Sequence, residues 1–342
     1  MTLVSVIIPV YNAQEYLAIC IESLLCQSLK QCEFIFVNDG STDLSLQIIE
    51  SFQLKDARIS IINQINKGVS QARNEGINKA SGTFLSFIDA DDYVENNFLE
   101  KLYTSAITTN AEIVTSNFNT EINGKLIKNL PLFATDKLFE YNEIQSQILP
   151  FFIEQDLLNT ACNKLYSANL IKSNRIVFPI NVTNGEDGLF NIMAFNSCKL
   201  AIFINVNGYF YREVANSATR NSSKTDYFKI ALEKYAINYK KEYNLSLDDD
   251  KVAQLKSIRL INNVISLIHI YLNSKAKTSF IYKYKYVSAM ISNADVQLAL
   301  KKYWIHLYYN KPKYQQFILY CIKLKSVLLL FLATSYSNFR NK

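Results

Sequence analysis

Three aspartates fall within four positions in the run Phe87-Ile88-Asp89-Ala90-Asp91-Asp92, where a strand-like segment ends. Carboxylates this close repel one another, and a partly buried cluster is costly unless a cation compensates its charge. Hard oxygen ligands without cysteine or histidine favour Mg²⁺ or Mn²⁺ over zinc. The cluster therefore predicts a divalent metal site, although an isolated run of this kind often forms only a solvated turn that caps the next helix.

A second acidic turn, Val37-Asn38-Asp39-Gly40-Ser41-Thr42-Asp43, follows another strand-like run. In open α/β sheets, ligands bind beyond the carboxyl ends of the strands, so both acidic turns are expected at one rim. Asp39 has an alternative interpretation as an Asx-turn residue before Gly40.

The glycine-rich phosphate-binding signatures are absent, because neither GxGxxG after the first strand nor GxxxxGK[ST] occurs. A nucleotide would then be held by carboxylates, an aromatic ring and a metal. Tyr11 could stack on a base, and Asp39 could accept a hydrogen bond from its ring N–H. Lys67 and Arg73 could meet a diphosphate, although each alone suits a solvated helix face equally well.

The elements that must position these residues alternate between strands and helices over the first 120 residues. We expect strands at Val4–Val10, Glu33–Asn38, Ile59–Asn63, Thr83–Asp89 and Ile113–Asn119, and helices from an Asn12/Glu15 capping pair to about Leu29, at Asp43–Ser51, Ser70–Ala80 and Asn97–Asn110. This pattern predicts a doubly wound α/β domain.

Further along, Asn123-Gly124 within Glu121–Lys128 predicts an antiparallel hairpin, and Ile176–Phe178 and Ala201–Tyr211 look extended. A short helix is expected near Glu186. From about Asp226 the sequence becomes long helical stretches rich in Lys, Tyr and Leu. We therefore predict a catalytic domain at 1–222 and a mostly α-helical C-terminal domain at 223–342.

Composition fits a folded protein in a reducing compartment. Hydrophobic residues make up 49% of the chain, and the six cysteines form no CxxC pair. The first residues lack the basic region and long apolar run of a signal peptide. These features predict a cytoplasmic location with reduced thiols.

Four runs taken together resemble the family 2 inverting glycosyltransferases of the GT-A fold. They are Ser5–Asn12, Val37–Asp43, Asn66–Gly68 with Ala72–Asn74, and Asp89–Asp92, and their order and spacing agree over about residues 3–105 and more weakly to about residue 220. The resemblance implies a Rossmann-like, doubly wound mixed sheet. It also implies a nucleotide-sugar donor, with UDP-sugars favoured and dTDP- and GDP-sugars as alternatives.

The resemblance also implies roles for single residues. Asp39 would recognise the base, Asp89 would contact the ribose or nucleotide side, and Asp91 would ligate the Mn²⁺ or Mg²⁺ that bridges the diphosphate. Asp92 would lie beside Asp91, in contact with sugar or metal. The remaining nucleotide-site residues expected from the same motifs are Pro9, Tyr11, Lys67, Arg73 and Ala90.

Inverting transfer needs a base for the acceptor hydroxyl, and the two histidines, His269 and His306, both lie in the helical tail. A carboxylate is therefore expected. Family 2 enzymes resembling this chain carry a Glu-Asp where it has Glu186-Asp187, with the aspartate as base. Without the resemblance, Asp187 would read as helix N-terminal charge.

Three weaker predictions concern the acceptor side. Glu186 is expected near the acceptor or sugar, and Asn163-Lys164 near the acceptor or diphosphate. The segment from Tyr211-Arg212 to Ser217 and Arg220 could be a loop that closes over the diphosphate, or an ordinary surface connection.

The tail is strongly basic. Residues 251–342 carry 15 Lys/Arg and one acidic residue, whereas residues 1–100 carry 6 Lys/Arg and 13 Asp/Glu. Basic residues with interfacial aromatics suit a helix lying on an anionic membrane, which would place the enzyme at the inner face of the plasma membrane. A helical appendage that packs or forms a homodimer is the alternative. Nucleic-acid binding is not expected, because no recognition motif accompanies the charge.

The sequence thus predicts a non-processive, metal-dependent hexosyltransferase that acts on a glycan or lipid-linked glycan in capsule, exopolysaccharide or lipopolysaccharide synthesis. Non-processive action is expected because the only tryptophan, Trp304, is not in a QxxRW motif and no 18–20-residue apolar run occurs. The alternatives are a nucleotidyltransferase that makes sugar nucleotides and a non-catalytic nucleotide-sugar-binding subunit.

Overall fold

A computed structural model describes residues 1–122, 124–180, 182, 184–214, 226–273, 279–309 and 311–340. The chain divides into two compact units, which are described separately. One comprises Met1–Phe152 with Asp156–Arg220, and the other Ile153–Gln155 with Asn221–Lys342.

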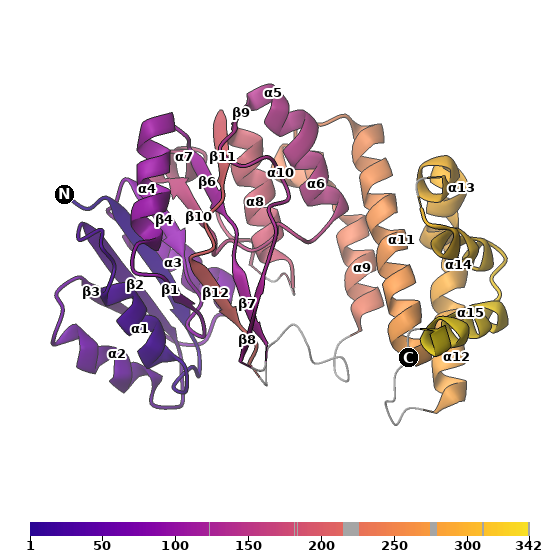
Figure 1. Ribbon diagram of the computed structural model, residues 1–342, viewed down its shortest axis with the longest axis horizontal. Coiled ribbons are helices and arrows are strands. Elements are labelled where there is room, and N and C mark those ends of the chain that lie inside the picture. The colour runs from indigo at the N-terminus through magenta and orange to yellow at the C-terminus, as the bar shows by residue number, and fades with distance from the viewer. Residues whose placement is uncertain are drawn as a thin grey trace. The chain divides into compact units, whose positions relative to one another are not determined.

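The first unit is built on an eight-stranded sheet of order β3-β2-β1-β4-β10-β6-β11-β9 (Figure 1). Its strands are β1 (Val4–Val10), β2 (Cys32–Asp39), β3 (Ile59–Gln64), β4 (Phe84–Phe87), β6 (Ile113–Ser116), β9 (Leu138–Glu140), β10 (Lys164–Ser167) and β11 (Leu200–Ile204). The first four are parallel, whereas β10 runs antiparallel to both of its neighbours. The predicted mixed, doubly wound α/β sheet is confirmed.

Helices cover both faces of the parallel part. The helices between its strands are α1 (Leu17–Leu25), α2 (Ser45–Gln53) and α3 (Val69–Lys79). The chain steps from β1 outward to β3 and then returns to β4, so right-handed crossovers put α3 on the opposite face from α1 and α2 (Figure 1). Val4, Val6 and Ile8 on one face of β1 and Ile7 on the other are all fully buried, as expected for a strand covered on both sides.

The first unit also contains a second, four-stranded sheet of order β5-β12-β7-β8. It consists of β5 (Tyr93–Val94), β7 (Asn119–Ile122), β8 (Lys125–Lys128) and β12 (Tyr209–Arg212). β7 and β8 pair antiparallel, which confirms the hairpin, although Asn123 itself lies outside the described residues. Because β5 follows the aspartates directly and pairs with β12, the end of the first unit returns to the acidic turn.

Two expectations about secondary structure are wrong. Asn12 does not cap a helix: its φ is +49° and its side-chain oxygen accepts a hydrogen bond from Thr42 N, so α1 starts only at Leu17 and ends at Leu25. Residues 176–178 form no strand. The extended segment expected at 201–211 is confirmed, and it forms two strands in different sheets, β11 and β12.

The remaining helices are α4 (Phe98–Thr109), α5 (Tyr141–Glu143), the π-helical turn η1 (Ile144–Ile148), α6 (Leu149–Glu154), α7 (Ala168–Ser173) and α8 (Glu186–Ser197). The second unit contains α9 (Tyr227–Ala236), α10 (Tyr239–Tyr243), α11 (Asp249–Asn273), α12 (Phe280–Ser292), α13 (Ala294–Tyr308), α14 (Lys313–Lys323) and α15 (Val327–Arg340). Its helical character is as predicted. Val264, Met290, Leu300, Ile318 and Leu330 belong to one buried core in this unit. No helix in the described ranges has the length and apolarity needed to cross a membrane.

The contact between α3 and β1 gives a test of the fold. A Cβ added to Gly76 would lie 2.3 Å from Cγ2 of the buried Ile7. Replacing glycine by alanine normally stabilises a helix, but here overpacking should make Gly76→Ala destabilising by about 1–3 kcal/mol. Urea unfolding would measure this, with Asn78→Ala at an exposed position of the same helix as the control. A more stable Gly76→Ala protein would contradict this helix–strand contact.

Candidate active site

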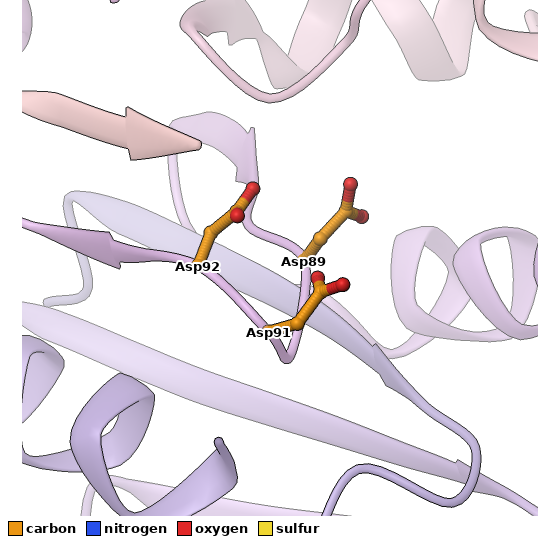
Figure 2. Close-up of side chains that lie close together, drawn as sticks. All are labelled: Asp89, Asp91 and Asp92. Carbon is orange, nitrogen blue, oxygen red and sulfur yellow. The ribbon is translucent and has the colours of Figure 1, made fainter. Parts of the chain in front are cut away.

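The three aspartates of the β4–β5 connection form one cluster (Figure 2). One carboxylate oxygen from each of Asp89, Asp91 and Asp92 lies within 4.8 Å of the others. Asp92 is fully buried, and its oxygens accept hydrogen bonds from Tyr209 Oη and from Arg212 N. Asp92 therefore links the acidic cluster to strand β12 through these two hydrogen bonds. Its predicted contact with sugar or metal stays a prediction.

The electrostatics of this cluster favour a bound cation. Burial, and then the charge of Asp89, raise the pKa of Asp91 to about 6, and the same two causes raise that of Asp92 well above its usual value. The three oxygens lie near enough to one another to be offered to a single cation. The donor set of hard oxygens thus fits Mg²⁺ or Mn²⁺, with Asp91 and Asp89 as the more accessible members.

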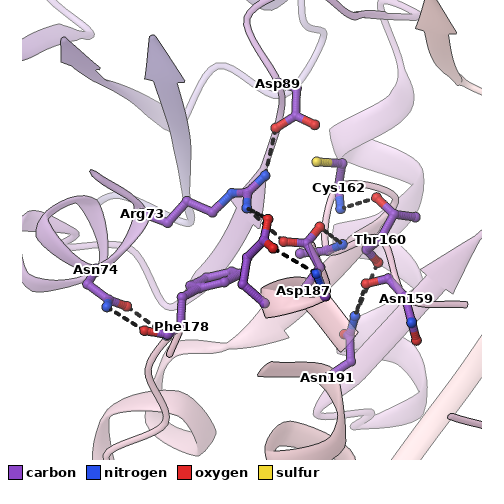
Figure 3. Close-up of polar contacts among 12 residues, drawn as sticks. Arg73, Asn74, Asp89, Asn159, Thr160, Cys162, Phe178, Asp187 and Asn191 are labelled. Carbon is purple, nitrogen blue, oxygen red and sulfur yellow. Dashed lines mark hydrogen bonds and ion pairs between the residues drawn. The ribbon is translucent and has the colours of Figure 1, made fainter. Parts of the chain in front are cut away.

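Arg73, in the first turns of α3, connects this cluster to a distant part of the chain (Figure 3). Its Nη2 donates to Asp89 at 2.9 Å and its Nη1 to Asp187 at 2.7 Å, and Glu186 lies 3.7 Å from Nη1. The side chain is only 4% exposed. Burial alone would lower the pKa of Arg73, but Asp187 and Asp89 outweigh it and raise that pKa.

Asp187 lies in the first turn of α8, after Gly185, whose φ of +131° suits glycine. Its second oxygen accepts a hydrogen bond from Ala161 N at 3.0 Å. Burial raises the pKa of Asp187 to about 6, against the opposing effect of Arg73. A carboxylate with such a pKa is ionised near neutral pH and still basic enough to accept a proton. The side chain keeps 18% exposure.

Asp39 ends β2 and organises the loop before α3. Its carboxylate accepts hydrogen bonds from Gln64 Nε2, Lys67 N and Gly68 N at 2.7–2.8 Å. Three bonds occupy most of its acceptor capacity, which leaves room for one further donor on Oδ2. The predicted contact with a base is compatible with this geometry but stays a prediction.

The other nucleotide-site candidates lie along the same edge of the sheet. Tyr11 follows the end of β1 and is 54% exposed, and Lys67 is also exposed in the loop after β3. Pro9 is partly buried within β1, and Ala90 is buried inside the acidic turn. An exposed ring and ammonium group remain available for a ligand, whereas Pro9 and Ala90 could offer mainly backbone.

The structure argues against the predicted acceptor or diphosphate contacts of Asn163 and Lys164. Lys164 is fully buried, and its ammonium group donates to the Leu158 and Thr160 carbonyls and to Asn163 Oδ1. Asn163 is buried as well and donates to Ser116 O. The cause is the antiparallel strand β10, which was not predicted from the sequence: Lys164 is its first residue, and Asn163 immediately precedes it.

Two contributors to the site were missed from the sequence. Tyr209 bonds to Asp92, and the ring of Phe178 lies 5.1 Å from the guanidinium carbon of Arg73. Two hydrogen bonds join the side chain of Asn74 to the backbone of Phe178: Asn74 Nδ2 donates to Phe178 O, and Phe178 N donates to Asn74 Oδ1 (Figure 3). Neither Tyr209 nor Phe178 belongs to a recognisable sequence motif. Of the residues in these contacts, only Asn74 lay in a run noted in the sequence, Ala72-Arg73-Asn74. The closing-loop residues Ser217 and Arg220 lie outside the described residues.

The acidic cluster gives a second test. Asp91→Asn removes one of the like charges, so without added cation the variant should melt at a higher temperature than the unmodified protein. Mn²⁺ should raise the melting temperature of the unmodified protein by mass action and that of the variant far less. Differential scanning fluorimetry at pH 7.5 would measure both. An unchanged Mn²⁺ shift in Asp91→Asn, with exposed Glu50→Gln as the control, would contradict this metal site.

Comparisons with known proteins indicate the family of this chain. Residues 5–172 match Glycosyl transferase family 2. Glycosyltransferase GlyG of Streptococcus pneumoniae is 32% identical over 226 residues, which cover 64% of this chain and 73% of GlyG. The uncharacterized glycosyltransferase EpsJ of Bacillus subtilis is 34% identical over 217 residues, and this match spans 64% of the chain and 63% of EpsJ. The chain therefore matches a little under two thirds of that relative.

A solved structure shows the same fold. The crystal structure of Staphylococcus aureus TarS 1–349 in complex with UDP-GlcNAc aligns with a TM-score of 0.70 at 19% identity, over 99% of this chain and 92% of TarS 1–349. At this identity the likeness shows the fold alone, and it is the GT-A fold that the sequence predicted. From the family match, the relatives and this fold, we conclude that the chain belongs to glycosyl transferase family 2.

Proposed function

We propose that this chain is an inverting, metal-dependent glycosyltransferase of bacterial polysaccharide synthesis, with a UDP-sugar as the favoured donor and a hydroxyl of a glycan or lipid-linked glycan as acceptor. The observation that carries the proposal is the double ion pair of Arg73, which joins the acidic cluster at Asp89 to the candidate base Asp187. Family membership and the TarS complex with UDP-GlcNAc support the donor class.

In the proposed reaction the acceptor oxygen attacks C1 of the donor sugar from the face opposite the leaving group. The new C1–O bond forms as the bond from C1 to the diphosphate oxygen breaks, and the nucleoside diphosphate departs with the bonding electron pair. Asp187 accepts the hydroxyl proton. Its orientation toward the reacting hydroxyl is set by Arg73 and Ala161 N, which each donate to one of its oxygens.

The donor side would be held by residues from four loops of the first unit. Tyr11 and Asp39 suit the base, while Lys67 supplies positive charge for the diphosphate. Asp91 and Asp89 would hold Mn²⁺ or Mg²⁺, which when bound offsets the negative charge that develops on the diphosphate. Glu186, within 3.7 Å of Arg73, would lie at the sugar or acceptor side.

The reaction products distinguish this function from its alternatives. A glycosyltransferase releases a nucleoside diphosphate, a nucleotidyltransferase releases or consumes pyrophosphate, and a binding subunit releases neither. A panel of UDP-, dTDP- and GDP-sugars can first be screened for Mn²⁺-dependent thermal stabilisation. Stabilising donors are then assayed for release of nucleoside diphosphate and of pyrophosphate.

The base assignment predicts the effect of one isosteric change. Asp187→Asn cannot accept the proton, so turnover should fall by about 10²–10⁴-fold. Donor affinity, measured by calorimetry with Mn²⁺, should change little because the amide keeps the shape of the side chain. Asp136→Asn, which removes a carboxylate from an exposed turn, is the matched control and should keep full turnover. Retained turnover in Asp187→Asn would reject Asp187 as the base.

We also propose that the C-terminal unit binds the anionic inner face of the plasma membrane. Helix α15 buries Leu330 and Ala333 in the core of that unit, yet also carries an apolar stripe on its outer side. This stripe consists of Leu328, Leu332, Tyr336 and Phe339, which are between 56% and 82% exposed. Residues 311–340 contain five Lys/Arg and no acidic residue. Apolar stripe and basic charge together suit anionic lipid, whereas like charge disfavours a second copy at this face.

Vesicle binding tests this proposal. The intact protein should co-sediment with vesicles of phosphatidylcholine and phosphatidylglycerol at 7:3 and much less with phosphatidylcholine alone. The double variant Leu328→Ser/Leu332→Ser should lose most of this binding, since it removes buried apolar area at the interface. Leu44→Ser/Leu54→Ser, which changes two exposed leucines of the first unit, serves as control. Equal binding by both double variants, or self-association in place of binding, would overturn the membrane assignment.

A further inference from the structure

The base candidate depends on a short backbone segment that precedes β10. Ala161 N donates to Asp187 at 3.0 Å, so the position of this peptide helps to fix where the carboxylate points. Residues 157–163 have no regular secondary structure beyond turns before β10. Something other than a helix or strand ladder must therefore hold the segment Leu158–Ala161 in place.

Lys164 provides one part of this support. Its Nζ donates to the carbonyls of Leu158 at 3.1 Å and Thr160 at 2.5 Å, and to Asn163 Oδ1 at 3.0 Å. These bonds use all three donors of an ammonium group. In the ranges that the structure describes, no carboxylate lies within ion-pair distance of this Nζ. A fully buried cation that binds only neutral acceptors is costly, so a purely stabilising role would be served better by an apolar side chain.

Asn191 of α8 binds the same segment (Figure 3). Its Nδ2 donates to Asn159 O at 2.8 Å and to Thr160 O at 3.3 Å, and its Oδ1 accepts from Tyr166 Oη at 2.7 Å. Asn191 lies four residues after Asp187 on α8 and hence on the same helix face. Between them, Gly188 has no room for a side chain, because an added Cβ would lie 2.8 Å from the Asn159 side chain.

We infer that Lys164 and Asn191 are positioning residues for the reaction: they clamp Leu158–Ala161 between β10 and α8, so that Ala161 N presents its hydrogen to Asp187. This inference rests on the proposed function, in which Asp187 is the base. Neither residue needs to contact a substrate. The clamp gives the buried Asn163-Lys164 pair a role that differs from the acceptor contact expected from the sequence.

The clamp acts within a defined electrostatic environment. The charged or titratable groups that act on Asp187 are Arg73 of α3, Glu186 of α8, Asp89 after β4, and Cys162, Lys164 and Tyr166 before or within β10. Burial lowers the pKa of Lys164 to about 7, while Asp187 opposes this shift. Loosening the segment would remove a hydrogen bond from the ionised base and so raise the pKa at which it loses its proton.

The experiment compares Lys164→Met with the unmodified protein and with Lys172→Met. The methionine keeps a long apolar side chain without donors, and Lys172 is an exposed lysine whose Nζ also binds a backbone carbonyl. Lys164→Met should lower kcat for nucleoside diphosphate release by about 10- to 100-fold, because a misplaced base loses alignment. Its affinity for UDP with Mn²⁺ should stay within about twofold, and the acid limb of its pH–rate profile should move to higher pH. Lys172→Met should match the unmodified protein.

A second variant keeps the test decisive if Lys164→Met does not fold. Asn191→Ala removes the hydrogen bonds that α8 makes to the segment. This variant should also have a lower kcat, while its affinity for UDP stays nearly unchanged. Full kcat with an unmoved acid limb in a folded variant would overturn the clamp, even if Asp187→Asn is inactive. Loss of kcat that merely parallels loss of folded protein in circular dichroism would overturn it as well. An unmodified protein that releases no nucleoside diphosphate from any donor would instead reject the proposed function.

Discussion

The guanidinium of Arg73 is buried between Asp89 at the end of β4 and Asp187 in the first turn of α8. These carboxylates are 98 residues apart in the sequence. Without the guanidinium group, each would lose its ion pair with Arg73. Breaking a buried pair by removal of one partner typically costs about 3–5 kcal/mol, because the remaining charge is left uncompensated. The geometry of the proposed reaction, with a cation site on one side and a base on the other, depends on this one side chain.

The fold explains how these groups come together. Parallel strands β1, β2 and β4 end at one rim, which places Asp39 and the acidic turn there. The antiparallel strand β10 then inserts beside β4 and brings the segment before it, including Ala161, to the start of α8. β12 pairs with β5 directly after the acidic turn and supplies Tyr209 to Asp92. These three parts of the fold thus converge on one set of carboxylates.

The sequence was informative where a residue's role follows from local pattern. Strand runs such as Val4–Val10 and the carboxylates that follow them were found because parallel strand ends share a rim. The sequence was misleading where tertiary contacts override local signals. Asn12 was expected to cap a helix, but its side chain instead accepts a hydrogen bond from Thr42 N. Lys164 was expected to contact a ligand, but it lies in strand β10 and is buried in the core. The contacts of Phe178 and Tyr209 have no sequence signal, because they arise from packing between segments about 100 residues apart or more.

The coupling of Arg73 to the base is tested most directly by the pH dependence of kcat at saturating donor and Mn²⁺, in the unmodified protein and in Arg73→Gln. Activity of the unmodified protein should fall as the pH drops through about 6, the pKa of Asp187, because protonation removes the base. Loss of the neighbouring cation raises that pKa, so the residual activity of Arg73→Gln should fall at a higher pH. An acid limb at the same pH in both proteins would contradict the account.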